Sequence, residues 1–183
     1  MAGRQWPRGV AVSGRPPDFW TFSLAVYADP GVQMECLALQ DGYGIDVNIL
    51  LFCAYVGAVH GAVVADAELL QAVDHVASWQ KDVVTKLRGA RRALRPFATH
   101  PSPVAASTTP LREQVKASEL ESEHIEQTML ETWSATRLDL WPRVEPDAAI
   151  AANVATLLAL LGEPDRRPAP PRHLITAALS ARG

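Results

Sequence analysis

The chain has 183 residues, a hydrophobic content of 48% and a formal net charge of −3. This length suits one domain, and the hydrophobic content excludes a chain that is disordered throughout. The slight negative charge argues against a protein that coats nucleic acid. Two cysteines, Cys36 and Cys53, lie in apolar stretches without a CxxC partner. We interpret them as buried thiols of a cytoplasmic protein, and the high Ala, Arg and Pro content as a sign of a bacterial source.

Residues 1–16 combine Gly, Pro and Arg without hydrophobic periodicity, and we expect a disordered N-terminal tail there. The tail has no apolar core of a secretory signal. A single helical domain is predicted over residues 17–183. Its first helix, about 17–27, is indicated by apolar residues at helical spacing, namely Phe19, Trp20, Ser23, Leu24 and Tyr27.

Helix-capping residues define the next two elements. Asp29 and Pro30 predict a helix over about 30–41 that ends at Gly42. Asp46 predicts the cap of a third helix, about 47–60, in which Ile45 can pack against Leu50. Residues 49–59 (ILLFCAYVGAV) contain no charged side chain, so this helix belongs either at the centre of a bundle or in a membrane. Eleven such residues fall short of the roughly 20 that span a bilayer, and we predict a buried central helix and no membrane span.

Residues 66–95 predict either one kinked helix or two helices, ended by Pro96. The Pro-, Ser- and Thr-rich segment 97–110 predicts a mobile linker. A fifth helix is expected over about 111–133, with Thr109 as its cap and Pro110 at its first position. Its predicted inward stripe consists of Leu111, Val115, Ser118, Ser122, Ile125, Met129 and Trp133.

Further helices are predicted over about 147–161 and 171–179, separated by a second mobile linker at about 163–170. No segment alternates as a half-buried strand would. The sequence therefore predicts an all-α fold, a compact bundle of about six to seven helices around the central helix at about 47–60.

Polar residues gather around the turn between the second and third predicted helices. With two glutamates of the fifth helix facing them, they make a hypothetical ligand-binding or enzymatic site built from Glu35, Gln40, Asp41, Asp46, Asn48, Glu119 and Glu123, with Tyr43 as a possible addition. The alternative is structural, with glycines ending one helix and Asp46 capping the next. Asn48 heads an apolar helix and must find hydrogen-bond partners under either interpretation.

The fifth helix is strongly acidic, and Glu121 and His124 form one Glu-x-x-His pair. A di-metal bundle needs two such pairs, so we predict no metal site and interpret this surface as solvated. The chain also lacks a P-loop, a G-x-G-x-x-G or H-E-x-x-H motif and a Ser-His-Asp order. We therefore predict no catalytic residue and no cofactor.

Basic residues share one face of the helix that precedes the linker, namely Lys81, Arg88, Arg91, Arg92 and Arg95. This stripe can bind phosphates, anionic lipid or an acidic partner. It can equally pair within the protein, because the acidic fifth helix can lie antiparallel beside it. We favour the internal pairing.

A resemblance to a known family rests on the residues between Phe19 and Phe52. The run L-Q-D at 39–41, Gly44 and D-V-N-I-L-L-F at 46–52 is similar to the signature of a small, mainly proteobacterial family of helical proteins, classified as a domain of unknown function. The resemblance covers about residues 17–133. It implies an all-helical fold and carries no activity.

Without a catalytic set, we expect a non-enzymatic helical adaptor or accessory protein that acts through a protein partner and not through nucleic acid. The alternative is the small-ligand or enzymatic site on the 35–48 turn, with the acidic helix 111–133 opposite it. The residues do not identify the partner, the ligand or the oligomeric state.

Overall fold

The computed structural model describes residues 16–99, 104–161 and 168–182. The described chain is helical, and its only bridge between extended residues joins Ala62 and Arg143. The elements are α1 (Phe19–Tyr27), α2 (Pro30–Tyr43), α3 (Val47–His60), α4 (Asp66–Trp79), a π turn (Gln80–Val84), α5 (Thr85–Thr99), α6 (Ala105–Ala135), a 3₁₀ turn (Leu138–Leu140), α7 (Pro146–Leu161) and α8 (Arg172–Ser180). The predicted all-α class is confirmed. Since α4, the π turn and α5 follow one another without a break, the predicted number of helices is confirmed as well.

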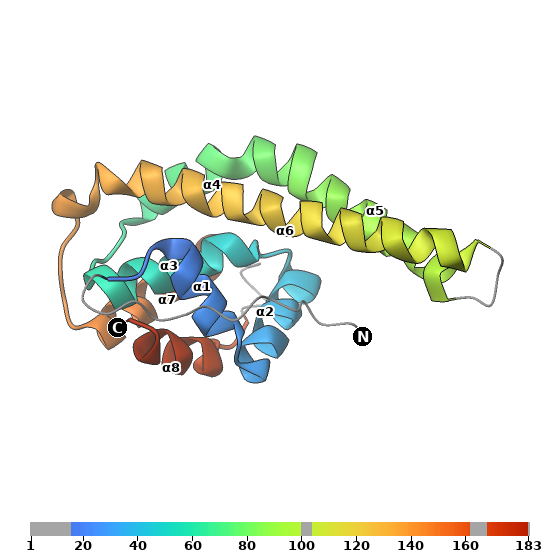
Figure 1. Ribbon diagram of the computed structural model, residues 1–183. Coiled ribbons are helices and arrows are strands. Elements are labelled where there is room, and N and C mark those ends of the chain that lie inside the picture. The colour runs from blue at the N-terminus through green and yellow to red at the C-terminus, as the bar shows by residue number, and fades with distance from the viewer. Residues whose placement is uncertain (1–15, 100–103, 162–167, 183) are drawn as a thin grey trace.

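Helix α3 is the centre of the bundle, as predicted (Figure 1). Asp46 caps it by accepting a hydrogen bond from the Asn48 N–H at 2.9 Å, and all residues except the last two are buried. Gly57 lets α7 approach closely, because a Cβ at this position would lie 2.5 Å from the backbone nitrogen of Ile150. Burial of apolar side chains on all sides of α3 thus supplies most of what holds it in the bundle.

Helices α1 and α2 follow the predicted capping pattern, with one correction. Asp18 accepts a hydrogen bond from the Thr21 N–H at 2.7 Å, and Asp29 accepts one from the Gly31 N–H at 2.6 Å. The prediction that α2 ends at Gly42 is wrong, because the helix continues to Tyr43 and is capped by Gly44. Gly44 has a φ of 68°, the left-handed conformation that glycine adopts most easily.

The boundaries of the predicted linker 97–110 need correction, because Pro96 just before it and Pro110 at its end both lie inside helices. Helix α5 continues past Pro96 to Thr99, and α6 begins at Ala105, so Thr109 is no cap and Pro110 is no first residue. Each proline removes one hydrogen bond to a carbonyl four residues earlier, of Arg92 and of Ala106. Both residues are exposed, so water can satisfy these carbonyls. The central part of the linker, 100–103, lies outside the described residues, as do 1–15 of the tail and 163–167 of the second linker.

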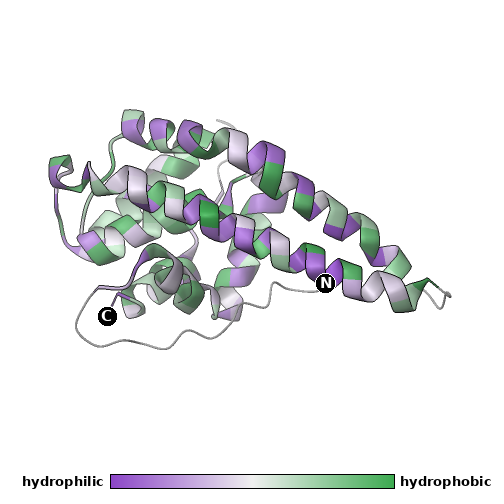
Figure 2. Cartoon of the chain, turned by 45° about the horizontal axis from the view of Figure 1, so that its top comes forward, coloured by the Kyte–Doolittle hydropathy of each residue, from purple (hydrophilic) through white to green (hydrophobic). Residues whose placement is uncertain are grey.

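Helices α5 and α6 form an antiparallel hairpin whose far end extends beyond the body of the protein (Figure 1). No residue of α5 is buried, and the buried residues of α6 lie only between Glu119 and Ser134. We call α5 together with residues 105–118 of α6 the arm. Polar and apolar residues alternate along it, whereas α3 and α7 are mostly apolar (Figure 2).

The inward face of α6 differs from the predicted stripe. Ser122 is buried as predicted, but Leu111 and Ile125 are 48% and 39% exposed and Ser118 is exposed. The buried residues are instead Glu119, Ser122, Glu123, Glu126, Gln127, Leu130 and Ser134. Met129 and Trp133 are partly buried against the core, as predicted. The stripe is wrong at Leu111, Ser118 and Ile125, because the prediction placed charged side chains on the solvent side, whereas here the carboxylates face partners inside the protein.

The last two helices match their predicted ranges, with α7 at Pro146–Leu161 and α8 at Arg172–Ser180. Asn153 of α7 ties the end of α3 to the chain that follows it. Its side chain donates to the carbonyl of Ala62 at 2.9 Å and accepts from the N–H of Val64 at 2.8 Å. In the described parts of the chain, no helix is both long and apolar enough to cross a membrane.

Candidate functional site

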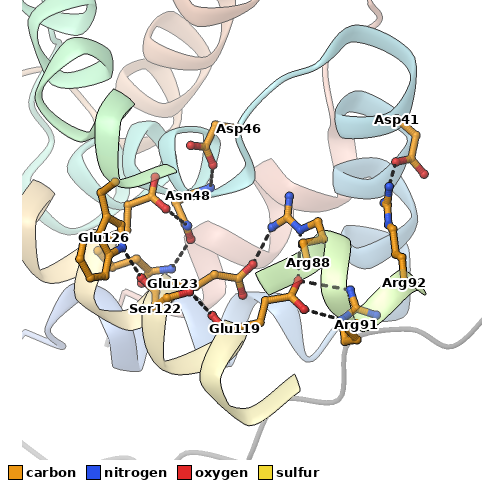
Figure 3. A network of polar contacts seen from close by, with 12 residues as sticks. Asp41, Asp46, Asn48, Arg88, Arg91, Arg92, Glu119, Ser122, Glu123 and Glu126 are labelled. Atoms are coloured by element: carbon orange, nitrogen blue, oxygen red, sulfur yellow. Dashed lines mark hydrogen bonds and ion pairs between the residues drawn. The ribbon is translucent and has the colours of Figure 1, made fainter. Parts of the chain in front are cut away.

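A network of buried polar side chains lies between α6 and the start of α3 (Figure 3). Its centre holds Glu119, Glu123 and Glu126 of α6, which are only 4%, 1% and 0% exposed. Carboxylates are rarely buried unless ion pairs or hydrogen bonds compensate for the lost water. The partners of these three groups therefore determine what the network does.

Two arginines of α5 pair with the carboxylates at the base of the arm. Arg88 donates from Nε to Glu119 at 3.1 Å and from Nη2 to Glu123 at 2.7 Å. Arg91 donates to Glu119 from both Nε and Nη2. Guanidinium groups bound in this way fix direction as well as distance, so these contacts set the orientation of α5 on α6.

The ion pairs also determine the charge of Glu119. Burial alone would raise the pKa of its carboxyl group. The hydrogen bonds and positive charges of Arg91 and Arg88 outweigh this effect and hold the pKa of Glu119 below its ordinary value of 4.5. Glu119 is thus an anion at neutral pH, and its contribution to stability is lost only as the pH falls through its lowered pKa.

An amide pair connects α3 to α6. Asn48 donates from Nδ2 to Oε2 of Glu126 at 2.8 Å, and Gln127 donates from Nε2 to Oδ1 of Asn48 at 3.0 Å. The backbone N–H of Asn48 is bound by Asp46. Asn48 therefore finds the partners that its position at the head of an apolar helix requires.

Glu126 differs electrostatically from the neighbouring glutamates. Its burial and the negative charges of Asp46 and Glu123 raise the pKa of Glu126 far above its ordinary value of 4.5, and the hydrogen bond from Asn48 opposes them only in part. At neutral pH this carboxyl group is protonated. Its Oε2 accepts from Asn48, whereas its Oε1 is buried without a hydrogen-bond partner among the described residues.

The structure brings together only part of the predicted ligand-binding set. Asp46, Asn48, Glu119 and Glu123 lie in the network, as Figure 3 shows. Glu35 lies elsewhere, because its two carboxylate oxygens accept the N–H groups of His173 and Leu174 at 3.0 Å each and so cap α8.

Two further members of that set remain on α2. The side chain of Asp41 is exposed and 3.4 Å from Arg92. Gln40 is half-buried, and its backbone carbonyl oxygen accepts a hydrogen bond from the N–H of the capping residue Gly44.

The basic stripe divides into internal and exposed residues. Arg88 and Arg91 pair with the acidic helix, which confirms the predicted internal pairing for these two. Arg92 reaches only Asp41, and both side chains are more than half exposed. Lys81 and Arg95 are exposed, and neither forms an ion pair within the described ranges. Three cations of the stripe thus face solvent.

Glu126 and Gln127 were missed by sequence reasoning. Together with Glu119, Ser122, Glu123 and Leu130 they recur at intervals of three and four residues, which places them on one face of α6. That periodicity is visible in the sequence. The predicted stripe does not follow it, because that stripe consists of apolar residues and serines and contains no charged side chain.

The predicted solvated acidic surface on α6 is therefore correct only in part. Glu121 is exposed, and His124 stacks on the ring of Trp20 with 4.3 Å between centroids. Across the residues that the structure describes, no three His, Cys, Asp or Glu side chains are arranged to hold a metal ion.

The arrangement can be compared with known protein families at this point. Residues 18–130 match the family described as "Protein of unknown function (DUF2390)". The chain belongs to this family. The DUF2390 region begins at the cap of α1 and ends within α6, so it contains every residue of the polar network and the whole arm, but neither α7 nor α8. No curated protein and no solved structure matches the chain.

Proposed function

We propose that this protein is a non-enzymatic helical adaptor that binds a partner protein through the arm. The observation that carries the proposal is the absence of buried residues from the arm. Neither α5 nor residues 105–118 of α6 buries a side chain, although together they make a long helical hairpin. Most helical stability in proteins comes from packing an amphipathic face, so an arm of this kind is suited to packing against another molecule.

The far end of the arm carries the apolar surface that such a contact needs. Phe97 is 57% exposed and Leu111 is 48% exposed. The pairing of Arg88 and Arg91 with Glu119 sets the antiparallel register of the two helices, and this register brings Phe97 level with Leu111. Large apolar side chains from two adjoining helices form a patch, whereas single exposed ones are ordinary on a protein surface.

Charge near this patch favours one kind of partner. Arg95 is exposed within one turn of Phe97, and Lys86 and Arg92 are exposed on α5 nearer the body of the protein, so a partner with an apolar patch and acidic residues would complement the arm. The alternative, a ligand or enzymatic site on the 35–48 turn, has less support. Its four residues in the network bind one another and Arg88, Arg91, Glu126 and Gln127, and Glu35 caps α8.

Photo-crosslinking in cells that express the full chain tests the adaptor. A photoreactive amino acid at Phe97 should capture one protein species, and the same group at Leu140, which is 75% exposed in the 3₁₀ turn, should not. The variant Leu111→Asp should reduce capture at least tenfold. The matched variant Met34→Asp, at a residue of α2 that is 67% exposed, should leave capture unchanged. Equal capture from positions 97 and 140, or capture that survives Leu111→Asp, would show that the arm does not bind the partner.

A further inference from the structure

A cleft of about 430 Å³ opens at the end of α6 opposite the arm. Its lining comes from the segment before α1, from the second half of α3 and from the last turns of α6 with the residues that follow. The principal lining residues are Pro17, Asp18, Tyr55, His60, Glu131 and Leu138. A volume of this size is in the range of small-molecule sites.

The cleft has a fixed polar floor. Tyr55 is 4% exposed, and its hydroxyl group donates to Oε1 of Glu131 at 3.2 Å. The same oxygen accepts the N–H of Phe19 at 3.2 Å. Both of these groups donate to the same oxygen, Oε1, and no hydrogen bond from the described residues reaches Oε2 of Glu131. The carboxylate is thus held in position with one acceptor oxygen available to a ligand.

His60 contributes a second polar group to the cleft. Its ring stands edge-on to the ring of Tyr55, with 5.2 Å between centroids. Burial and the nearby charge of Arg143 lower the pKa of His60 below 6.5, so the ring is neutral at neutral pH. A neutral imidazole has one nitrogen that accepts a hydrogen bond, and it does not repel a cation.

The charges of the lining select one class of ligand. Asp18 and Glu131 are acidic, and neither lysine nor arginine is among the lining residues. A metal ion is disfavoured, because the described Asp, Glu, His and Cys side chains form no group of three that could hold one. An ammonium group has less demanding geometry, since it needs acceptors only within hydrogen-bond distance of its three N–H bonds. Pro17 and Leu138 offer apolar walls for the carbon part of such a molecule.

We propose that this cleft binds a small organic compound with a primary ammonium group, which donates hydrogen bonds to Oε2 of Glu131 and to the ring of His60. This site is independent of the arm, since it is formed at the C-terminal end of α6 and the arm contains the N-terminal end. Failure of either proposal leaves the other intact.

Titration of the full chain with benzylammonium chloride, followed by ¹⁵N–¹H NMR, tests the site. We expect a saturable shift of the Phe19 amide, whose N–H binds Glu131, and affinity at least tenfold higher than for benzyl alcohol or benzoate. The variant Glu131→Gln should weaken benzylammonium binding at least tenfold. The matched control Glu121→Gln, at an exposed glutamate of the same helix, should bind as the unaltered chain does.

A second variant keeps the test decisive if Glu131→Gln does not fold. Leu138→Trp adds a large side chain at the half-buried wall of the cleft and leaves Glu131 in place, so it should abolish the Phe19 shift. The proposal is overturned by equal affinity for the alcohol or benzoate, by saturable shifts confined to residues far from the cleft, by the absence of any saturable shift, or by unchanged binding to a folded Glu131→Gln or Leu138→Trp variant.

Discussion

Helices α3 and α5 have nearly equal lengths, 14 and 15 residues, but opposite kinds of interaction hold them in the protein. All but the last two residues of α3 are buried, whereas α5 has no buried residue. Burial of apolar surface is non-directional and supplies most of the stability of a fold. Ion pairs such as those of α5 supply orientation and less net energy. The body and the arm should therefore respond differently to the same kind of mutation.

The largest expected effect is on the free energy of unfolding, and it is measured by making the same Leu→Ala substitution in α3 and in α5. Leu51 of α3 is fully buried, and Leu51→Ala should lower the free energy of unfolding by about 2–5 kcal/mol because it leaves a cavity. Leu87 of α5 is half-buried, and Leu87→Ala should cost about 1 kcal/mol. Urea unfolding measures both values. Equal losses for the two variants would mean that α5 belongs to the core as much as α3 does.

The next effect is expected at the base of the arm. Arg88→Met leaves Glu119 with one arginine and removes the Arg88 ion pair from Glu123, so it should cost about 2 kcal/mol. Amide hydrogen exchange should become faster along α5. The control Arg92→Met removes an exposed ion pair, in which Nη2 of Arg92 lies 3.4 Å from Oδ1 of Asp41. This variant should lower the free energy of unfolding by at most about 0.5 kcal/mol. Similar losses for both variants would contradict the role assigned to the buried pairs.

The last effect depends on pH and concerns the protonated carboxyl group of Glu126. Its pKa is raised in the folded chain, so the folded protein holds a proton that the unfolded chain loses above pH 4.5. The free energy of unfolding should therefore fall as the pH rises above 4.5. Glu126→Gln keeps an amide in place of the neutral acid and should remove that contribution.

Thermal unfolding between pH 5 and pH 9 measures this difference. The variant should become increasingly more stable than the unaltered chain as the pH rises, because only the unaltered chain has the Glu126 proton to lose. Parallel pH profiles for the two proteins would show that Glu126 is ionised in the folded state.

Local sequence signals were sufficient for α3. The cap at Asp46 and the uninterrupted apolar run define its start and its burial, since both depend only on neighbouring residues. The proline signals failed at Pro96 and Pro110 because a proline in an exposed stretch of helix frees a carbonyl that water can satisfy. Solvation of these carbonyls, which the proline positions alone do not reveal, therefore allowed α5 and α6 to extend past the predicted ends.

The polar sites were harder to predict than the helices. Glu119 and Glu123 can be buried because Arg88 forms ion pairs with both. Arg88 precedes them by 31 and 35 residues, and a single sequence does not show which residues so far apart will pair. The cleft is formed from residues near 18, 55 and 131, which no local motif connects. The sequence was therefore sufficient to name several residues of the polar network, whereas the residues of the cleft could be identified only from the folded structure.

The π turn at Gln80–Val84 has a consequence for how the arm can evolve. A wide turn contains an additional residue compared with an α-helix, and it rotates everything that follows about the helix axis. One deletion there would turn Arg88 and Arg91 by about 100° away from their carboxylates. The number of residues in this turn thus fixes the rotation of α5 about the helix axis relative to α4. Insertions or deletions in the turn should therefore be tolerated far less well than substitutions on the exposed surface of the arm.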